Sequence, residues 1–167
     1  MQAFDSLSRD IQQYIYDKGW PSLTNIQSAA IKQVANTDHN LILSAPTASG
    51  KTEATFIPAL NSVEDWETGL KVLYVSPLKA LINDQFQRIS ELSEYLDIPI
   101  TRWHGEVSQT QKRKVVNQPK GILLITPESI EGMLVNRPGE AEHLFKGVEW
   151  IIIDELHSFL GTERGIH

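Results

Sequence analysis

The fold is decided by residues 45–52, APTASGKT, which follow the short apolar run of residues 41–43, Leu-Ile-Leu. Short, almost continuous apolar runs recur along the rest of the chain, and they are typical of parallel strands buried on both faces. The predicted strands are residues 41–44, 71–75, 98–102, 121–125 and 149–153. Amphipathic segments lie between them, at residues 51–63, 78–95, 108–117 and 127–135. This alternation predicts an α/β fold with a doubly wound, mostly parallel sheet flanked by helices.

Two helices are expected before the first strand. Apolar residues recur with helical spacing over residues 7–18, where Gly19 ends the pattern, and again over residues 26–34. We expect residues 1–167 to form a single domain, in which residues 1–38 are an N-terminal helical segment.

Composition excludes several classes of protein. The chain has no cysteine, which excludes disulfides and thiolate metal sites. No apolar run approaches the roughly 20 residues that span a bilayer, and no secretory signal is visible, so we expect a cytoplasmic protein without a membrane partner. The net charge of −6 argues mildly against a general electrostatic coat for nucleic acid. It leaves open a local groove in which backbone N–H groups bind phosphates.

The APTASGKT stretch matches the end of a phosphate-binding loop, in which Gly-Lys-Ser/Thr joins a strand to a helix. Backbone N–H groups at the start of the helix can bind phosphate oxygens beside Gly50. Lys51 can reach the β and γ phosphates, and the hydroxyl of Thr52 can bind Mg²⁺. The alternative is an ordinary helix start, capped by Thr47 or Ser49.

An acidic pair follows the last predicted strand, about a hundred residues later. Residues 151–153 are Ile-Ile-Ile, and Asp154 and Glu155 come directly after them. The first carboxylate can position Mg²⁺, and the second can take a proton from an attacking water molecule. A protein that only carries a nucleotide does not need the second acid. The alternative is an acidic pair that starts a helix and interacts favourably with its dipole.

Two further strand ends share one local chemistry. Ser76-Pro77 and Thr126-Pro127 each combine a good N-cap with a proline at the first helical position. Each is therefore expected to begin a helix, and helix N-termini attract phosphates. Two such ends could hold the backbone of one nucleic-acid strand without reading its sequence. Ordinary capping remains the alternative, and for Trp103, packing is favoured over stacking on a base.

Taken together, these motifs resemble the first RecA-like domain of a superfamily-two helicase of the DEAD/DEAH-box-like kind. Residues 19–27 resemble the Q motif, 45–52 motif I, 76–85 motif Ia, 126–129 motif Ib and 154–157 motif II. The order of the five motifs fits the family, and the resemblance covers nearly the whole chain.

The resemblance implies ATP and Mg²⁺ as cofactors and assigns roles to individual residues. Lys51, Asp154 and Glu155 would be catalytic, with Thr52 and Asp154 binding Mg²⁺. The implied nucleotide-binding residues are Phe4, Gln27, Thr47, Ala48, Ser49, Gly50, Lys51 and Thr52. The implied nucleic-acid contacts are Ser76, Pro77, Lys79, Thr126, Pro127 and Glu128. His157 would couple the nucleotide site to the rest of the motor.

The sequence departs from the common family pattern in motif I and in motif II. Ala48 replaces a common glycine, so it must either keep a negative φ or carry strain. Motif II is DELH rather than DEAD, and the tail HSFLGTERGIH resembles that of the Lhr-like (large helicase-related) group.

We expect an ATP-hydrolysing motor domain that acts on single-stranded or duplex nucleic acid, with DNA favoured over RNA. A second RecA-like domain is expected beyond residue 167, so the chain alone should be weakly active. The alternatives are an RNA helicase domain, a translocase that never separates strands, a nucleotide-switch module of a repair or defence assembly, and a small-molecule kinase.

Overall fold

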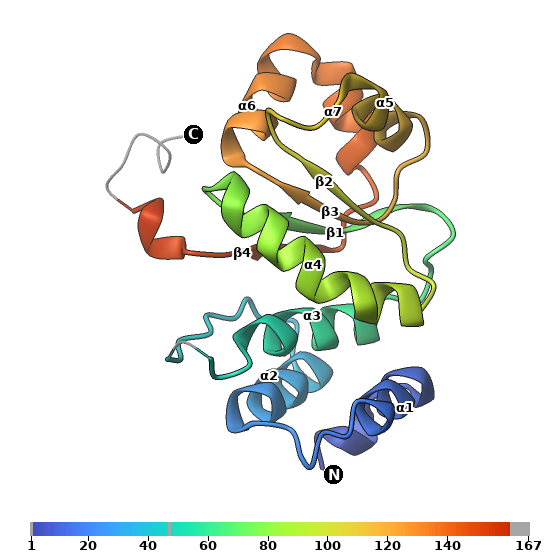
Figure 1. Cartoon of the computed structure of the whole chain (residues 1–167), viewed down its shortest axis with the longest axis vertical. Helices are drawn as coiled ribbons and strands as arrows, with labels where there is room; N and C mark the ends of the chain where they lie inside the picture. The colour runs from blue at the N-terminus through green and yellow to red at the C-terminus, as the bar shows by residue number, and fades with distance from the viewer. Residues whose placement is uncertain (1, 47, 161–167) are drawn as a thin grey trace. The chain divides into compact units, whose positions relative to one another are not determined.

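The computed structural model describes residues 2–46 and 48–160. The chain divides into two compact units, residues 1–64 and 65–167. In the described part, the first unit is made of helices and the second holds the sheet (Figure 1). The single-domain organisation of residues 1–167 stays a prediction.

The first unit confirms the expected helices. Its elements are η1 (Phe4–Ser6), α1 (Arg9–Asp17), α2 (Asn25–Asn36) and α3 (Lys51–Ser62). The start of α1 is capped by Ser8, whose side chain accepts from the N–H of Ile11. The start of α2 has a full capping box between Thr24 and Gln27, which satisfies two N–H groups that the helix leaves unpaired.

The predicted strand at residues 41–44 is wrong. These residues have no regular secondary structure, and Ile42 is 83% exposed. An extended segment obtains its backbone hydrogen bonds from a neighbouring strand. No strand lies in the described residues of the first unit, so the segment has no neighbour within its own unit.

The second unit contains a four-stranded parallel sheet, which confirms the predicted fold class. The strands are β1 (Gly69–Val75), β2 (Ile100–Trp103), β3 (Lys120–Ile125) and β4 (Trp150–Ile153). Their order across the sheet is β2-β3-β1-β4. The connecting elements are α4 (Lys79–Tyr95), α5 (Gln109–Asn117), α6 (Pro127–Asn136) and α7 (Pro138–Phe145), and η2 (Leu156–Ser158) follows β4.

Helices cover both faces of this sheet. One face packs its apolar side chains against α5, α6 and α7, and the cluster includes Leu73, Val115, Leu123, Met133 and Leu144. The helix α4 lies on the other face, where it buries Ile82, Ile89 and Leu92 (Figure 1). Trp103 is only 3% exposed and belongs to the apolar cluster that packs against α5, α6 and α7. This confirms the prediction that Trp103 packs in the interior. None of the described helices is long and apolar enough to cross a membrane.

A β-bulge interrupts the pairing of β1 with β3. Leu70 pairs with Gly121 and Val72 pairs with Ile122, so Lys71 has no partner in β3. Lys71 is 8% exposed, and its ammonium lies 3.0 Å from the Glu149 carboxylate. The extra residue lets Leu70 face the same core cluster as Leu73, although they are three positions apart.

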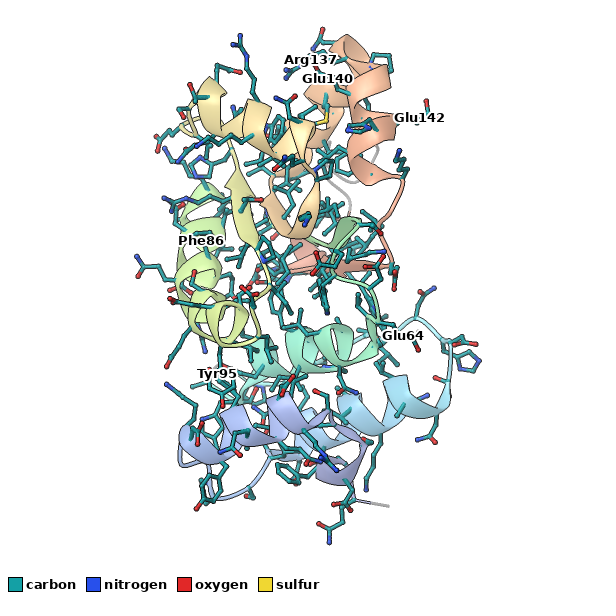
Figure 2. All side chains as sticks on the ribbon, turned by 90° about the vertical axis from the view of Figure 1, so that its right-hand side faces the viewer. Glu64, Phe86, Tyr95, Arg137, Glu140 and Glu142 are labelled. Carbon is teal, nitrogen blue, oxygen red and sulfur yellow. The ribbon has the colours of Figure 1, made fainter. Side chains whose placement is uncertain are left out.

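Helix α7 was not predicted. Arg137 separates it from α6, and Pro138 occupies its first turn. Nη1 of Arg137 lies 3.3 Å from a carboxylate oxygen of Glu140. Figure 2 labels both residues. Pro138 and the buried pair Ala141 and Leu144, three residues apart, are the signal that could have identified this helix.

Candidate nucleotide and nucleic-acid site

The predicted phosphate-binding loop leads directly into α3. Gly50 is the N-cap in the left-handed region, at φ 81° and ψ 26°, and as a glycine it has no side chain to cap the helix. Lys51 is exposed and Thr52 is half-buried at the start of the helix. A helix that starts at a glycine without a capping side chain, followed by an exposed lysine, fits a bound phosphate group. Thr47 lies outside the described residues.

The sequence predicts that Ala48 either keeps a negative φ or carries backbone strain. The structure shows the second case, because the φ of Ala48 is 61°. A residue with a Cβ atom is strained in this region by about 1–2 kcal/mol. Ala48 is exposed. The side-chain oxygen of Ser49 is buried without a hydrogen-bond partner among the described residues. A strained loop with an unsatisfied hydroxyl is the kind of feature that clusters where ligands bind.

Gln27 connects the Q motif to the phosphate loop within the first unit. Its side chain is buried, and its Nε2 donates to the carbonyl of Gly50 at 3.4 Å. Its Oε1 accepts from the backbone N–H of Thr24 at 2.9 Å. The amide keeps one further N–H, so the predicted contact with adenine stays open to it. Phe4 lies in η1 and is 36% exposed, and its role stays a prediction.

The parallel sheet of the second unit brings four predicted segments to one edge. Because all four strands run the same way, the residues that follow them share the carboxyl edge of the sheet, where α/β proteins bind ligands. In the order of the strands, these residues are His104, Thr126, Ser76 and Asp154.

Asp154 is held by two hydrogen-bond donors. The hydroxyl of Tyr74 donates to its Oδ2, and the backbone N–H of Glu155 donates to its Oδ1 at 2.8 Å. Burial, reinforced by the hydrogen bond to Asp154, raises the pKa of Tyr74 well above its ordinary value. Tyr74 was not identified from the sequence, where it reads as an ordinary strand residue.

Glu155 has a strained backbone, at φ 52° and ψ 45°. This left-handed residue ends the extended strand conformation directly after Asp154, and η2 begins at the next residue. Nε2 of His157 lies 3.1 Å from a carboxylate oxygen of Glu155. The residue predicted to couple the motor therefore contacts the residue predicted to activate water.

The two Ser/Thr-Pro segments differ. Thr126 is the N-cap of α6 with Pro127 in the first turn, as expected, and its hydroxyl shares a hydrogen bond with Ser129. The prediction that Ser76-Pro77 begins a helix is wrong, because α4 begins at Lys79 after an extended Leu78. Ser76 is fully buried, and its N–H donates to the carbonyl of Ile125, which continues the pairing of β1 with β3.

Lys79 and Glu128 lie on the surface at the starts of α4 and α6. The ammonium of Lys79 pairs with the carboxylate of Glu106, and both side chains are more than half exposed. This pairing lowers the pKa of Glu106. Because exposed ion pairs contribute little stability, Lys79 can exchange this partner for a phosphate at small cost.

A polar cluster next to this pair was not expected from the sequence. Asn83 Oδ1 accepts from Arg102 at 2.9 Å and lies 3.1 Å from Nε2 of His104. Nδ1 of His104 accepts from the N–H of Glu106, so Nε2 is the protonated nitrogen. Burial and then the charge of Arg102 lower the pKa of His104. Asn83 and His104 are far apart in sequence, which is why only the structure reveals the cluster.

The residues present fit a magnesium ion that is bound mainly through a nucleotide. No group of three His, Cys, Asp or Glu side chains gathers as a metal site in the described part of the chain. Mg²⁺ in nucleotide sites needs only one or two protein ligands beside phosphate oxygens and water. Each carboxylate oxygen of Asp154 accepts one hydrogen bond and keeps a second lone pair that can bind a metal ion or a water molecule.

Comparison with known proteins places the chain in a family. The family model of DEAD/DEAH box helicases matches residues 24–167. The "ATP-dependent helicase Lhr-Core" of Methanocaldococcus jannaschii is 29% identical over 99% of this chain. The "Lhr helicase/uracil glycosylase" of Escherichia coli is 34% identical over 86% of this chain. The chain covers 21% of the length of the first relative and 10% of the second.

A solved structure supports the same assignment. The Mycobacterium smegmatis helicase Lhr, bound to ssDNA and AMP-PNP, matches with a TM-score of 0.84 at 28% identity. The match covers 99% of this chain and 22% of that protein. This likeness confirms the predicted RecA-like fold. The chain belongs to the DEAD/DEAH box helicase family, and the relatives it resembles include Lhr-type ATP-dependent helicases.

Proposed function

We propose that this chain is the ATP-binding motor domain of an ATP-dependent nucleic-acid helicase or translocase. In this proposal, Lys51 and Thr52 bind the phosphates and Mg²⁺, and Gln27 binds the adenine. Asp154 positions Mg²⁺, and Glu155 takes a proton from the attacking water. When bound, Mg²⁺ would stabilise the negative charge that develops on the transferred phosphoryl group.

The observation that carries this proposal is the arrangement at the end of β4. Asp154 is oriented by two donors, and the strained backbone of Glu155 sets the second carboxylate apart from the first. A nucleotide carrier has no use for a second, separately held acid, whereas a hydrolase needs a base for water.

The carboxyl edge of the sheet is the proposed surface for nucleic acid. The starts of α4 and α6 lie at this edge with Lys79 exposed, and Thr126 and Pro127 begin α6. Helix starts that follow adjacent strands suit the backbone of a single strand. We favour DNA because the M. smegmatis relative was solved with ssDNA.

A second RecA-like domain is part of the proposal, because this chain covers only 21% of the length of the M. jannaschii relative and 10% of the E. coli relative. In related phosphoryl-transfer enzymes, an arginine supplied by another domain accelerates hydrolysis roughly 10³–10⁵-fold. The chain alone should therefore bind Mg-ATP, hydrolyse it slowly and unwind nothing.

The first test is calorimetric titration of the chain with Mg-ATP and Mg-ADP beside a Lys51→Ala variant. Binding that the variant loses supports the site, because the charge of Lys51 acts on the phosphates while its helix position tolerates alanine. Absence of binding at millimolar nucleotide, or equal binding by the variant, would refute the proposal for the nucleotide site.

A second test separates a motor from a nucleotide switch and DNA from RNA. Glu155→Gln should leave nucleotide binding within about threefold and lower the residual ATPase rate at least about tenfold. An unchanged rate would favour the switch module. Competition between ssDNA and ssRNA of the same sequence, with fluorescently labelled ssDNA as the probe, decides between the two nucleic acids. Preference for RNA would overturn that part of the proposal.

A further inference from the structure

The main chain of Asp154 is attached to the neighbouring strand. Ile153 pairs with Val75 in the parallel ladder between β4 and β1. The N–H of Asp154 donates to the carbonyl of Val75 at 2.9 Å, so the pairing extends one residue beyond the end of β4. The position of the Asp154 Cα atom is therefore set by β1.

The side chain of Asp154 is attached to the same strand by Tyr74. Tyr74 pairs with Ile152, and residues two apart in a strand share a face, so Tyr74 and Asp154 lie diagonally on one face. Only a long side chain spans a diagonal of this kind, and tyrosine carries a donor at its far end. The ring is 2% exposed, which holds the hydroxyl in one place.

The other oxygen of the same carboxylate is fixed from a different direction. The backbone N–H of Glu155, the next residue along the chain, donates to Oδ1 at 2.8 Å. With Tyr74 on Oδ2 and Glu155 on Oδ1, rotation of the carboxylate about its χ2 angle would break both bonds. An ionised carboxylate is only an acceptor, so the tyrosine hydroxyl must be the donor.

We infer that Tyr74 is a positioning residue that orients the Asp154 carboxylate for Mg²⁺, an inference that rests on the proposed role of Asp154. In this role, Tyr74 contacts Asp154 and neither the nucleotide nor the metal. It acts by holding the lone pairs that remain on Asp154 in one direction, as outer partners do for metal ligands generally. A purely structural tyrosine would affect stability alone.

The test is Tyr74→Phe, which keeps the buried ring and removes only the hydroxyl. ADP binding is titrated by calorimetry in EDTA and at increasing Mg²⁺ concentrations, and the Mg²⁺ concentration that gives half of the affinity gain is measured. Loss of an outer partner typically costs 10–100-fold in metal affinity, so this concentration should rise about tenfold or more. ADP affinity in EDTA should not change.

Two variants make the result specific. Tyr14→Phe removes the hydroxyl of another buried tyrosine, in α1 of the first unit, and should leave the Mg²⁺ dependence unchanged. Asp154→Asn should abolish most of the Mg²⁺ effect, and adding Tyr74→Phe to it should change nothing further. Thermal unfolding of each variant shows that the comparison is made on folded protein.

The outcomes separate the two proposals. If Asp154→Asn removes the Mg²⁺ effect and Tyr74→Phe leaves it unchanged, the positioning role is overturned and the proposed function stands. If Tyr74→Phe lowers only the melting temperature, the hydrogen bond is structural and the inference is again overturned. If the unmodified chain shows no Mg²⁺ effect at all, the proposed role of Asp154 fails and this inference fails with it.

Discussion

Replacing Gly50 by alanine tests how the phosphate loop is held against the Q motif. Gly50 has a φ of 81°, and a Cβ atom added there would lie 2.5 Å from Nε2 of Gln27. It would also lie 3.3 Å from Cδ of Gln27 and 3.5 Å from Oγ1 of Thr24. The amide cannot simply swing away, because its Oε1 accepts from the N–H of Thr24 in the capping box.

The expected cost is the sum of two effects. A Cβ atom in the left-handed region costs about 1–2 kcal/mol. Displacing Gln27 breaks its bond to the Gly50 carbonyl and weakens the capping box of α2, which costs about 1 kcal/mol more. Gly50→Ala should therefore lower the free energy of unfolding by about 2–3 kcal/mol. For a chain of this size, that corresponds to a fall in melting temperature of about 4–12 °C.

Ala48→Gly is the matched control, because it removes a Cβ atom where φ is 61° in the same loop. The relief of strain, about 1–2 kcal/mol, is offset by the greater flexibility of glycine in the unfolded chain, about 0.5–1 kcal/mol. Its free energy of unfolding should therefore be unchanged or rise by up to about 1.5 kcal/mol.

Urea unfolding measures both variants, and hydrogen exchange over α2 and the start of α3 shows where any loss occurs. Gly50→Ala should accelerate exchange in both helices and weaken Mg-ADP binding. A Gly50→Ala protein with unchanged unfolding free energy and unchanged exchange would refute the proposed link between Gln27 and the loop.

The remaining predictions concern the second unit. Gly121→Ala should lower the free energy of unfolding by about 3 kcal/mol or more, because its φ is 68° and the new Cβ would lie 2.0 Å from the Pro99 carbonyl oxygen. Gly132 lies inside α6 with open space around it, so Gly132→Ala should instead raise the free energy of unfolding by about 1 kcal/mol. Equal changes for Gly121→Ala and Gly132→Ala in urea unfolding would contradict both predictions. The pKa of His104 is lower in the folded protein than in the unfolded chain, so the unfolded chain binds a proton more readily. The free energy of unfolding should therefore fall as the pH drops below about 6.5. His104→Gln should reduce that fall in unfolding titrations between pH 7.5 and 5, and an identical pH dependence in both proteins would count against the burial of a neutral histidine.

Much of the second unit could be predicted from its sequence. The apolar runs that became β1 and β3 are buried along almost their whole length, so their composition identifies them. The run that became β4 is equally apolar, although Ile151 and Ile153 are exposed. Helices α4, α5 and α6 begin and end close to the predicted positions, because their apolar spacing is a local feature.

The features that could not be predicted depend on a partner distant in sequence. A strand at residues 41–44 needs a neighbour, and apolar composition does not supply one. The hydroxyl of Tyr74 meets Asp154 only because β1 and β4 are adjacent, although the residues are 80 positions apart. The start of α4 is delayed to Lys79 because Ser76 continues the ladder to Ile125, which its favourable capping chemistry does not reveal.

The bulge in β1 has a consequence for how this strand tolerates changes in length. The strand has seven residues, but Lys71 has no partner in β3. Deleting Lys71 would leave a regular ladder with β3 in which Leu70 still faces the core and Tyr74 still faces Asp154. The cost would be the ion pair with Glu149 and the hydrogen bond from the Glu149 N–H to the Lys71 carbonyl. Deleting Leu73 would reverse the side-chain alternation within the paired part of the strand. The strand can therefore lose the residue at this position without turning Tyr74 away from the proposed magnesium ligand.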